Sequence, residues 1–201
     1  MTVSIQREDH RSLEAYASVS IAFEVSEIVD VSTLRLGSSR LTWSPISPSW
    51  TKDYDALSPN GPLGWASRYA INKWVFLAAY SGNAERLGGA AVVIDQAGIM
   101  AVGGRLDYAM LWDLRVASFA RRHSIGGALL AEVEVVARQA GYRGLEVETQ
   151  DINVAACRLY ATHHFAVTGI NPGVYHDAPT ETQLIWTKEF RAPIQHYVPA
   201  G

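Results

Sequence analysis

The chain has 201 residues, of which 48% are hydrophobic and 18% are charged, and its formal net charge at pH 7 is −3. This composition is ordinary for a globular protein, and the length allows a full hydrophobic core without disulfides or a structural metal. A slightly acidic chain lacks the basic surface that a general nucleic-acid binder needs. No apolar run approaches the roughly 20 residues of a membrane-spanning helix.

Cysteine usage and the N-terminal sequence indicate where the protein works. The single cysteine, Cys157, can form no internal disulfide and has no partner for a zinc cage, which favours a reducing compartment. The N-terminus has no basic region followed by an apolar stretch, so it does not match a signal peptide. We therefore expect one cytoplasmic domain, residues 1–201, without a metal and without nucleic-acid or membrane partners. The sequence leaves the oligomeric state open, a homodimer included.

The sequence of the first third of the chain predicts few regular secondary-structure elements. Residues 2–7 alternate weakly and open as a strand, and residues 15–31 are rich in β-formers, which predicts a second strand. Residues 34–62 contain several prolines and serines, so we expect an irregular segment with a short helix near residues 53–57. One or two helical turns are expected over residues 65–72.

From residue 74 onward the pattern is clearer. Residues 74–80 form an apolar run that ends at a Ser-Gly-Asn turn, and residues 86–95 and 110–116 predict further strands. The order then changes to helix, strand, helix, with residues 145–149 as the strand. A last pair of strands is expected at residues 167–170 and 183–188. This order predicts a mixed α/β (α+β) fold with one mostly antiparallel sheet and a parallel, right-handed crossover after residue 116.

A basic, glycine-containing turn precedes the most regular predicted helix. Apolar residues from Ile125 to Ala140 recur at spacings of three or four, and Gly141 ends the stripe. The turn before it places unpaired amides, the positive end of the helix dipole and two arginines together, which suits a phosphate group. The alternative is a solvated basic turn with a glycine-softened helix start. The turn comprises Arg121, Arg122, His123, Ser124, Ile125, Gly126 and Gly127.

This segment resembles a known family. The pattern VxxxxRxxGxG-A-LL, followed by a strand and an N-x-x-A-x-x-x-Y helix, resembles the acetyl-CoA-binding core of the GNAT N-acetyltransferase superfamily. It runs from Val116 through the turn to Leu130 and continues at Asn153, Ala156 and Tyr160. The stretches LWDLRV, VETQDINVAACRLYATHHF and QLIWTKEF are similar to the streptothricin-acetyltransferase-type group. The similarity covers about residues 87–190.

The resemblance implies a GNAT fold, with a splayed central sheet of six or seven strands flanked by helices, and acetyl-CoA as cosubstrate. It implies that the pantetheine arm pairs with the backbone of Leu114, Arg115 and Val116. The pyrophosphate would rest on the amides from Arg122 to Gly127. Asn153 and Tyr160 would then lie on the thioester side, with Tyr160 as the general acid for the leaving thiolate.

Two positions depart from the family pattern. Ser124 stands where the pattern has its first glycine. If that position requires a positive φ, serine costs about 1 kcal/mol; if it does not, the serine hydroxyl can donate to a phosphate oxygen. Trp112 stands where many relatives carry a glutamate, which removes one frequent candidate for the catalytic base.

Several residues have both a catalytic and a structural interpretation. Tyr160 can equally be a core aromatic, and Asn153 a helix N-cap. For the base that deprotonates the amine, Glu148 is the first candidate and Asp113 the second. The structural alternative is a salt-bridged sheet face in which Arg115 pairs with a glutamate of the neighbouring strand. His163 and His164 are expected to cap and pack the C-terminal end of the second helix. Cys157 is expected to be an inert buried thiol.

The acceptor side is predicted less sharply. We expect residues 34–72 to form much of its wall. Aromatic and acidic side chains there suit a cation, although the aromatic residues can equally be core or surface residues. From the other side, the loop before the last strand can contribute. The candidates are Trp43, Trp50, Asp53, Tyr54, Asp55 and Trp65, with Glu146, Glu148, Tyr175 and Asp177 opposite.

Together these features predict an acetyl-CoA-dependent N-acetyltransferase acting by direct attack in a ternary complex. The acceptor suggested by the resemblance is a primary amine of a small cationic molecule, a streptothricin-like antibiotic or a polyamine. The alternatives are acetylation of a protein or peptide amine, and a non-catalytic acyl-CoA-binding regulatory module.

Overall fold

A seven-stranded sheet organises the computed structural model, which describes residues 2–57, 61–95 and 104–190. The strand order is β1-β4-β5-β6-β7-β9-β8, and only β6 and β7 run parallel. The predicted mixed fold with a mostly antiparallel sheet is confirmed. The strands are β1 (Val3–Glu8), β4 (Trp74–Ser81), β5 (Arg86–Val93), β6 (Tyr108–Val116), β7 (Gly144–Gln150), β8 (Ala166–Pro172) and β9 (Thr182–Glu189).

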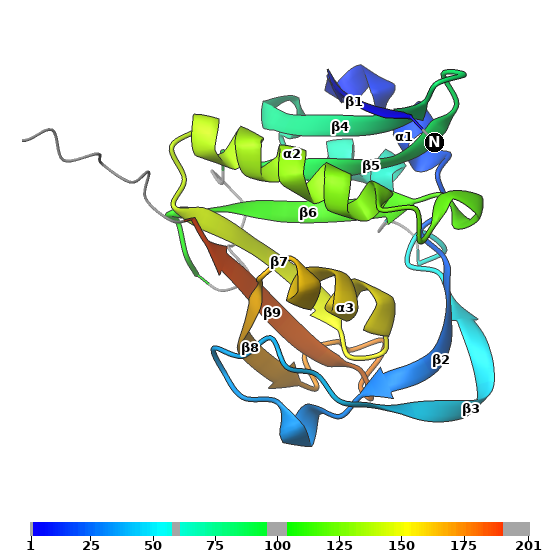
Figure 1. The fold of residues 1–201 in the computed structure, drawn as a ribbon, viewed down its shortest axis with the longest axis vertical. Coiled ribbons are helices and arrows are strands. Elements are labelled where there is room, and N and C mark those ends of the chain that lie inside the picture. The colour runs from blue at the N-terminus through cyan, green and yellow to red at the C-terminus, as the bar shows by residue number, and fades with distance from the viewer. Residues whose placement is uncertain (1, 58–60, 96–103, 191–201) are drawn as a thin grey trace, which may run out of the picture.

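The two longer helices cover one face of this sheet. In Figure 1, α2 (Ile125–Gln139) crosses β4, β5 and β6, and α3 (Val154–Thr162) lies over β7 and β9. Leu129 and Val133 of the predicted apolar stripe are fully buried against the sheet. The other face is covered by α1 (Leu13–Ala17) and short 3-10 turns. The 3-10 turns on this face are Pro62–Ser67 and Ile71–Lys73, and His10–Ser12 leads into α1. Two further 3-10 turns, Val31–Thr33 and Ser118–Ala120, lie by the core on the side of α2 and α3.

A separate two-stranded ribbon, β2 (Phe23–Val29) with β3 (Trp43–Lys52), curves past α3 at the side of the molecule (Figure 1). The prediction was wrong at this ribbon in two places. The expected strand over residues 15–31 begins only at Phe23, because residues 13–17 form α1. The ten-residue strand β3 lies within the segment expected to be irregular. Its prolines and mostly exposed residues give no apolar alternation, as suits an edge strand.

The short turns were predicted with mixed success. The 3-10 turns around residues 62–67 and 71–73 match the helical turns expected over residues 65–72. No helix forms over residues 53–57, where the chain makes bends and a turn instead.

The parallel pair β6–β7 separates part-way along its length. Tyr108 to Leu111 pair with Gly144 to Val147, but beyond Leu111 the two strands have no paired residues. A bulge begins at the same point, since Val92 pairs with Leu111 and Ala91 with Asp113, which skips Trp112. The break leaves the end of each strand facing an open wedge, and this wedge contains the site described next.

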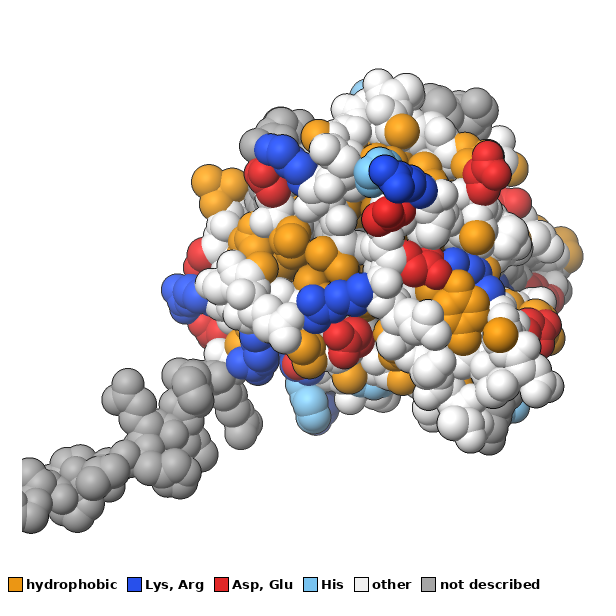
Figure 2. All heavy atoms as spheres, turned by 90° about the horizontal axis from the view of Figure 1, so that it is seen from above, with side chains coloured by type: hydrophobic (Ala, Val, Ile, Leu, Met, Phe, Trp, Pro, Cys, Tyr) orange, Lys and Arg blue, Asp and Glu red, His pale blue; other side chains and the backbone are white. Residues whose placement is uncertain are grey.

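Acidic and basic side chains are mixed on the surface. Figure 2 looks down on the upper side of the molecule as drawn in Figure 1, and there Lys, Arg, Asp and Glu side chains are interspersed. Among its described residues, that face carries no extended basic surface.

Candidate active site

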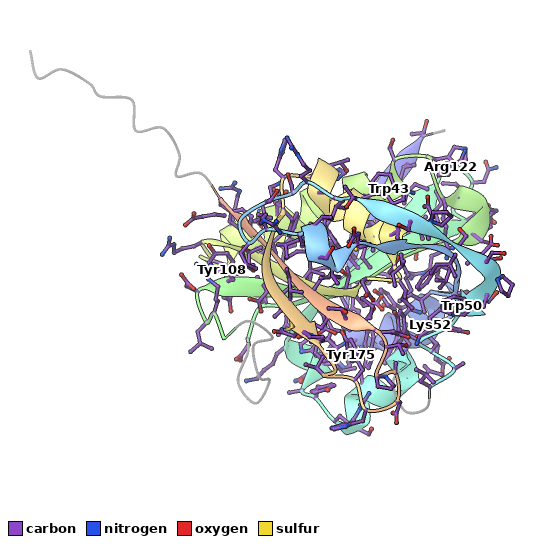
Figure 3. All side chains as sticks on the ribbon, turned by 90° about the horizontal axis from the view of Figure 1, so that it is seen from below. Trp43, Trp50, Lys52, Tyr108, Arg122 and Tyr175 are labelled. Atoms are coloured by element: carbon purple, nitrogen blue, oxygen red, sulfur yellow. The ribbon has the colours of Figure 1, made fainter. Side chains whose placement is uncertain are left out.

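A cleft of about 1150 Å³ runs through the wedge between β6 and β7. The start of α2 and one side of α3 line one part of it, and the segments after β3 and before β9 line the other. In Figure 3, Lys52 and Tyr175 mark this second part in the lower half of the view, whereas Arg122 lies at the upper right. The sheet break therefore gives the cleft two chemically different halves.

The turn before α2 has the backbone geometry that the family pattern anticipates. Arg122 and Ser124 both have positive φ, 65° and 62°, so Ser124 occupies the left-handed conformation that favours glycine. A Cβ at Gly127 would lie 2.6 Å from Nε2 of His163, so a larger residue there would have to displace the His163 ring between α2 and α3. Ser124 to Gly127 all line the cleft. The first-turn amides of α2 and the positive end of its dipole thus lie at the cleft, where an anion is favoured.

The two arginines of this turn play different parts. Arg121 donates from Nε to the carbonyl of Val116 at 3.0 Å and from Nη2 to the carbonyl of Ala22 at 2.7 Å, so its guanidinium ties the turn to the ribbon. Arg122 is exposed and lines the cleft. The ring of His123 lies 2.9 Å from the Arg121 carbonyl, and His123 is not among the residues that line the cleft. Of these three side chains, only that of Arg122 is both exposed and at the cleft.

The side chain of Arg115 faces the protein interior. It donates to both carboxylate oxygens of Asp113, at 2.9 and 2.8 Å, and to Asp55 at 2.8 Å. The expected pairing of Arg115 with a glutamate of β7 is wrong, because β6 has no β7 partner beyond Leu111. Asp113 also accepts from the hydroxyl of Tyr16, so its carboxylate is held by an arginine and a phenol. This makes Asp113 a poor candidate for a base.

Glu148 is the cleft carboxylate best suited to receive a proton. It accepts from the hydroxyl of Tyr175 at 2.5 Å and from Nε2 of Gln183 at 2.9 Å. Burial raises the pKa of Glu148 above its ordinary value, although the bonds from Tyr175 and Gln183 act in the opposite direction. Within the described residues, no ion pair involves Glu148. Glu146 is only 2% exposed and does not line the cleft, so its prediction as an acceptor contact is wrong.

Tyr160 and Asn153 lie on α3 as the spacing predicts. Tyr160 is buried against the rings of Phe165 and Trp186, with centroid distances of 5.4 and 6.3 Å, and it lines the cleft. Burial raises the pKa of Tyr160 well above its ordinary value, so the phenol stays protonated and can donate. The side chain of Asn153 accepts from the amide of Ala156 at 3.1 Å, which confirms the N-cap. Asn153 also lines the cleft.

The predicted acceptor residues divide into those at the cleft and those away from it. Trp43 and Trp50 are 42% and 43% exposed on the ribbon and do not line the cleft. The guanidinium of Arg158 lies 4.0 Å from the Trp43 ring centroid. The wall prediction for these two tryptophans is therefore wrong, and Asp53 does not line the cleft either. The residues that do line it are Tyr54, Asp55, Trp65, Glu148, Tyr175 and Asp177.

Sequence reasoning missed the contacts that join these walls. Lys52, at the end of β3, forms an ion pair with Glu181 in the segment before β9, and both side chains are largely buried. The segment that follows β3 is joined to β6 by the ion pair between Asp55 and Arg115. Tyr69 and Trp112 also line the cleft. No local pattern marks an ion pair between residues so far apart along the chain.

Comparison with known proteins identifies the family. The model of the acetyltransferase (GNAT) family matches residues 41–165, more than half of the chain. The chain belongs to the acetyltransferase (GNAT) family. The GNAT fold anticipated from the turn sequence is thereby confirmed, and among the described residues no helix is long and apolar enough to cross a membrane.

The individual relatives point to one group within this family. Streptothricin acetyltransferase A of Bacillus subtilis (strain 168) is 38% identical over 85 residues, which are 41% of this chain and 49% of that protein. The chain therefore spans about half the length of the curated relative it matches.

Solved structures share the fold at lower identity. A nourseothricin acetyltransferase has a TM-score of 0.70 at 18% identity, with 94% of this chain and 99% of that chain covered. A provisionally assigned streptothricin acetyltransferase from Bacillus anthracis str. Ames, in complex with acetyl coenzyme A, has a TM-score of 0.72 at 21% identity. That match covers 95% of this chain and 100% of the other. The resemblance to the streptothricin-acetyltransferase group is confirmed.

Proposed function

We propose that this protein transfers an acetyl group from acetyl-CoA to the primary amine of a small cationic acceptor such as a streptothricin-like molecule. The amine would attack the thioester directly in a ternary complex. The observation that carries this proposal is the two-sided cleft. One half presents helix amides, and the other presents the carboxylate of Glu148 without a cationic partner among the described residues.

The donor half fits a phosphate-bearing thioester. The amides at the start of α2 face the cleft and are suited to phosphate oxygens, and the exposed Arg122 adds a positive charge beside them. On β6, Leu114 and Val116 lie beyond the last residue paired with β7, which leaves backbone groups available to an extended chain. The bound cosubstrate would supply the activated acetyl group. In this proposal, the β6 backbone orients the thioester and its amide near Leu114 stabilises the developing oxyanion.

The acceptor half fits a protonated amine. An alkyl ammonium has a pKa of about 10.4 and must lose one proton before its nitrogen can attack. Glu148 would attract the ammonium and accept that proton directly or through water. Its raised pKa makes the carboxylate a stronger base than an ordinary surface glutamate. The hydroxyl of Tyr175 holds the carboxylate in place.

Tyr160 would assist departure of the thiolate. A phenol whose pKa is raised by burial does not give up its proton fully to a thiolate of pKa about 8.5. It would instead donate a hydrogen bond that strengthens as negative charge develops on sulfur. The expected contribution is therefore to turnover rather than to ground-state affinity.

The test is a thiol-release assay with acetyl-CoA and streptothricin, aminoglycosides and polyamines, with mass spectrometry of the product. We expect turnover and a gain of one acetyl group. Tyr160→Phe should lower kcat by about tenfold or more and change acetyl-CoA affinity little. Tyr142→Phe is the matched control, because the Tyr142 hydroxyl bonds the Ile94 carbonyl away from the cleft. Tight acetyl-CoA binding without turnover of any amine would instead indicate a binding module. An unchanged kcat in Tyr160→Phe would remove Tyr160 from the mechanism.

A further inference from the structure

An aromatic wall lines the acceptor half of the cleft. It consists of Trp65, Tyr69 and Trp112, all of which line the cleft. The ring centroids of Tyr69 and Trp112 are 4.9 Å apart and those of Trp65 and Trp112 are 6.3 Å apart, both pairs close to edge-to-face. Trp65 is buried, whereas Tyr69 and Trp112 are partly exposed. The wall therefore combines a fixed aromatic support with accessible ring surface.

Trp112 and its neighbour Asp113 lie on the same face of the sheet, at the β6 bulge. Leu111 belongs to the core beneath α2, while Met110 and Trp112 pack on the opposite side of the sheet. Asp113, the next residue, also lies on that opposite side, because it accepts from Tyr16. Trp112 and Asp113 are successive residues and share a face only because the bulge interrupts the alternation of side chains along β6. The ring of Trp74 supports Trp112 from behind at a centroid distance of 5.0 Å. The aromatic surface is thus pre-organised by the backbone.

The local charges show which part of an acceptor suits this wall. The guanidinium of Arg68 lies 5.4 Å from the Tyr69 ring centroid, so a second cation seated there would meet a like charge. Elsewhere in the cleft, Asp55 and Glu181 are engaged in ion pairs. Neither Glu148 nor Asp177 has an ion pair within the described residues; Asp177 is exposed and Glu148 is partly buried, so Glu148 is the natural partner for the ammonium. The wall is therefore suited to an uncharged part of the acceptor rather than to another amine.

We propose that the wall is a subsite for an uncharged planar ring of the acceptor, while its primary amine lies at Glu148. The subsite rests on the proposed acetyltransferase function and narrows its substrate class. It favours ring-bearing amines over polyamines, whose second ammonium would approach Arg68. Trp112 and Tyr69 determine this specificity by contact with the ring and take no part in proton transfer.

The experiment compares three primary amines: 2-phenylethylamine, butylamine and 1,4-diaminobutane. Binding to the full chain saturated with CoA is measured by calorimetry, and turnover with acetyl-CoA is measured by thiol release. Burial and edge-to-face contact of one ring are expected to give phenylethylamine about tenfold or more tighter binding than butylamine. The diamine should bind no better than butylamine.

Variants separate a ring subsite from a general structural role. Trp112→Ala and the milder Tyr69→Leu should each remove most of the preference for phenylethylamine and leave butylamine binding within about twofold. Trp50→Ala, an exposed tryptophan outside the cleft, is the matched control and should preserve the preference. If Trp112→Ala fails to fold, Tyr69→Leu still decides the question.

The outcomes distinguish this subsite from the proposed function. Equal binding of phenylethylamine and butylamine overturns the subsite, and turnover of both would leave the acetyltransferase proposal standing. Preference for the diamine overturns it in favour of a cation site. Ring-selective binding without turnover of any amine would support the subsite and contradict the proposed function.

Discussion

Replacing Arg115 by methionine tests the interior role that the structure gives this residue. The Arg115 side chain is 0% exposed and donates to Asp113, to Asp55 and to the carbonyl of Val19. It also lies 5.0 Å from the ring centroid of Tyr16. Burial alone would lower its pKa, but the charge and hydrogen bonds of Asp113 raise it above the ordinary value. The guanidinium is therefore charged at any pH at which the protein is studied.

The expected cost follows from what the substitution leaves behind. Methionine fills much of the volume but leaves Asp113, whose side chain is 8% exposed, without its cation. Breaking a buried ion pair in this way costs about 3–5 kcal/mol. Each kcal/mol shifts Tm by roughly 2–4 °C in a chain of this size, so Tm should fall by about 6–20 °C. Asp55 also loses its tether, so acceptor KM should rise in any active variant.

Scanning calorimetry and urea unfolding measure this loss directly. Arg7→Met is the matched control, because the side chain of Arg7 is 47% exposed in its ion pair with Glu132. That surface pair should contribute no more than about 1 kcal/mol. If Arg115→Met lost less than about 1 kcal/mol, the buried network could not hold the 53–57 segment against β6 as argued.

Three further substitutions or treatments probe separate features. Ser124→Gly should raise stability by about 0.5–1 kcal/mol in urea unfolding, because φ is 62° at this position; a loss would show that serine stabilises the turn in another way. In pH profiles of kcat/KM, the acid limb should lie above the ordinary glutamate pKa and disappear in Glu148→Gln, because burial raises the pKa of Glu148; a limb that persists in the variant belongs to another group. Because the pKa of Glu148 is raised in the folded state, its protonation stabilises the fold at a pH below the pKa of the unfolded state. This contribution is lost as the pH rises through the pKa of the folded state, so Glu148→Gln should gain stability relative to the wild type between these two pKa values. Cys157 should resist alkylation at pH 8 until the protein is denatured, because burial raises the pKa of its thiol to about 12; labelling of the folded protein, read by mass spectrometry, would contradict this.

The donor half of the cleft could be predicted because it is local in sequence. The strand end, the basic turn and the first turn of α2 follow one another within residues 114–127. Their geometry depends on neighbours along the chain, including the positive φ at Ser124. The detail that escaped was the direction of Arg121, which donates to Ala22. That contact joins segments about a hundred residues apart, and no local pattern contains it.

The acceptor half could not be predicted because it is assembled from distant segments. Its walls meet through the ion pairs Lys52–Glu181 and Arg115–Asp55. The strand that brings Lys52 there is proline-containing and mostly exposed, so it lacks the periodicity by which strands are recognised. The expected partner of Arg115 was wrong for a related reason. Alternation shows which residues share a face, but it does not show where two strands separate.

In the proposed reaction, the sheet break at Trp112 would place donor and acceptor recognition side by side while leaving each separately adjustable. Beyond Leu111, separation from β7 frees the backbone of β6 for the donor half. At the same point the Trp112 side chain lies on the opposite side of the sheet from α2 and lines the cleft. In the proposed reaction, donor contacts here would depend on backbone groups, which a substitution at residue 112 leaves in place. The acceptor would instead meet the Trp112 side chain. In the proposed reaction, a change at Trp112, or in the segments that the ion pairs Lys52–Glu181 and Arg115–Asp55 hold at the cleft, would therefore alter acceptor choice without altering the donor turn.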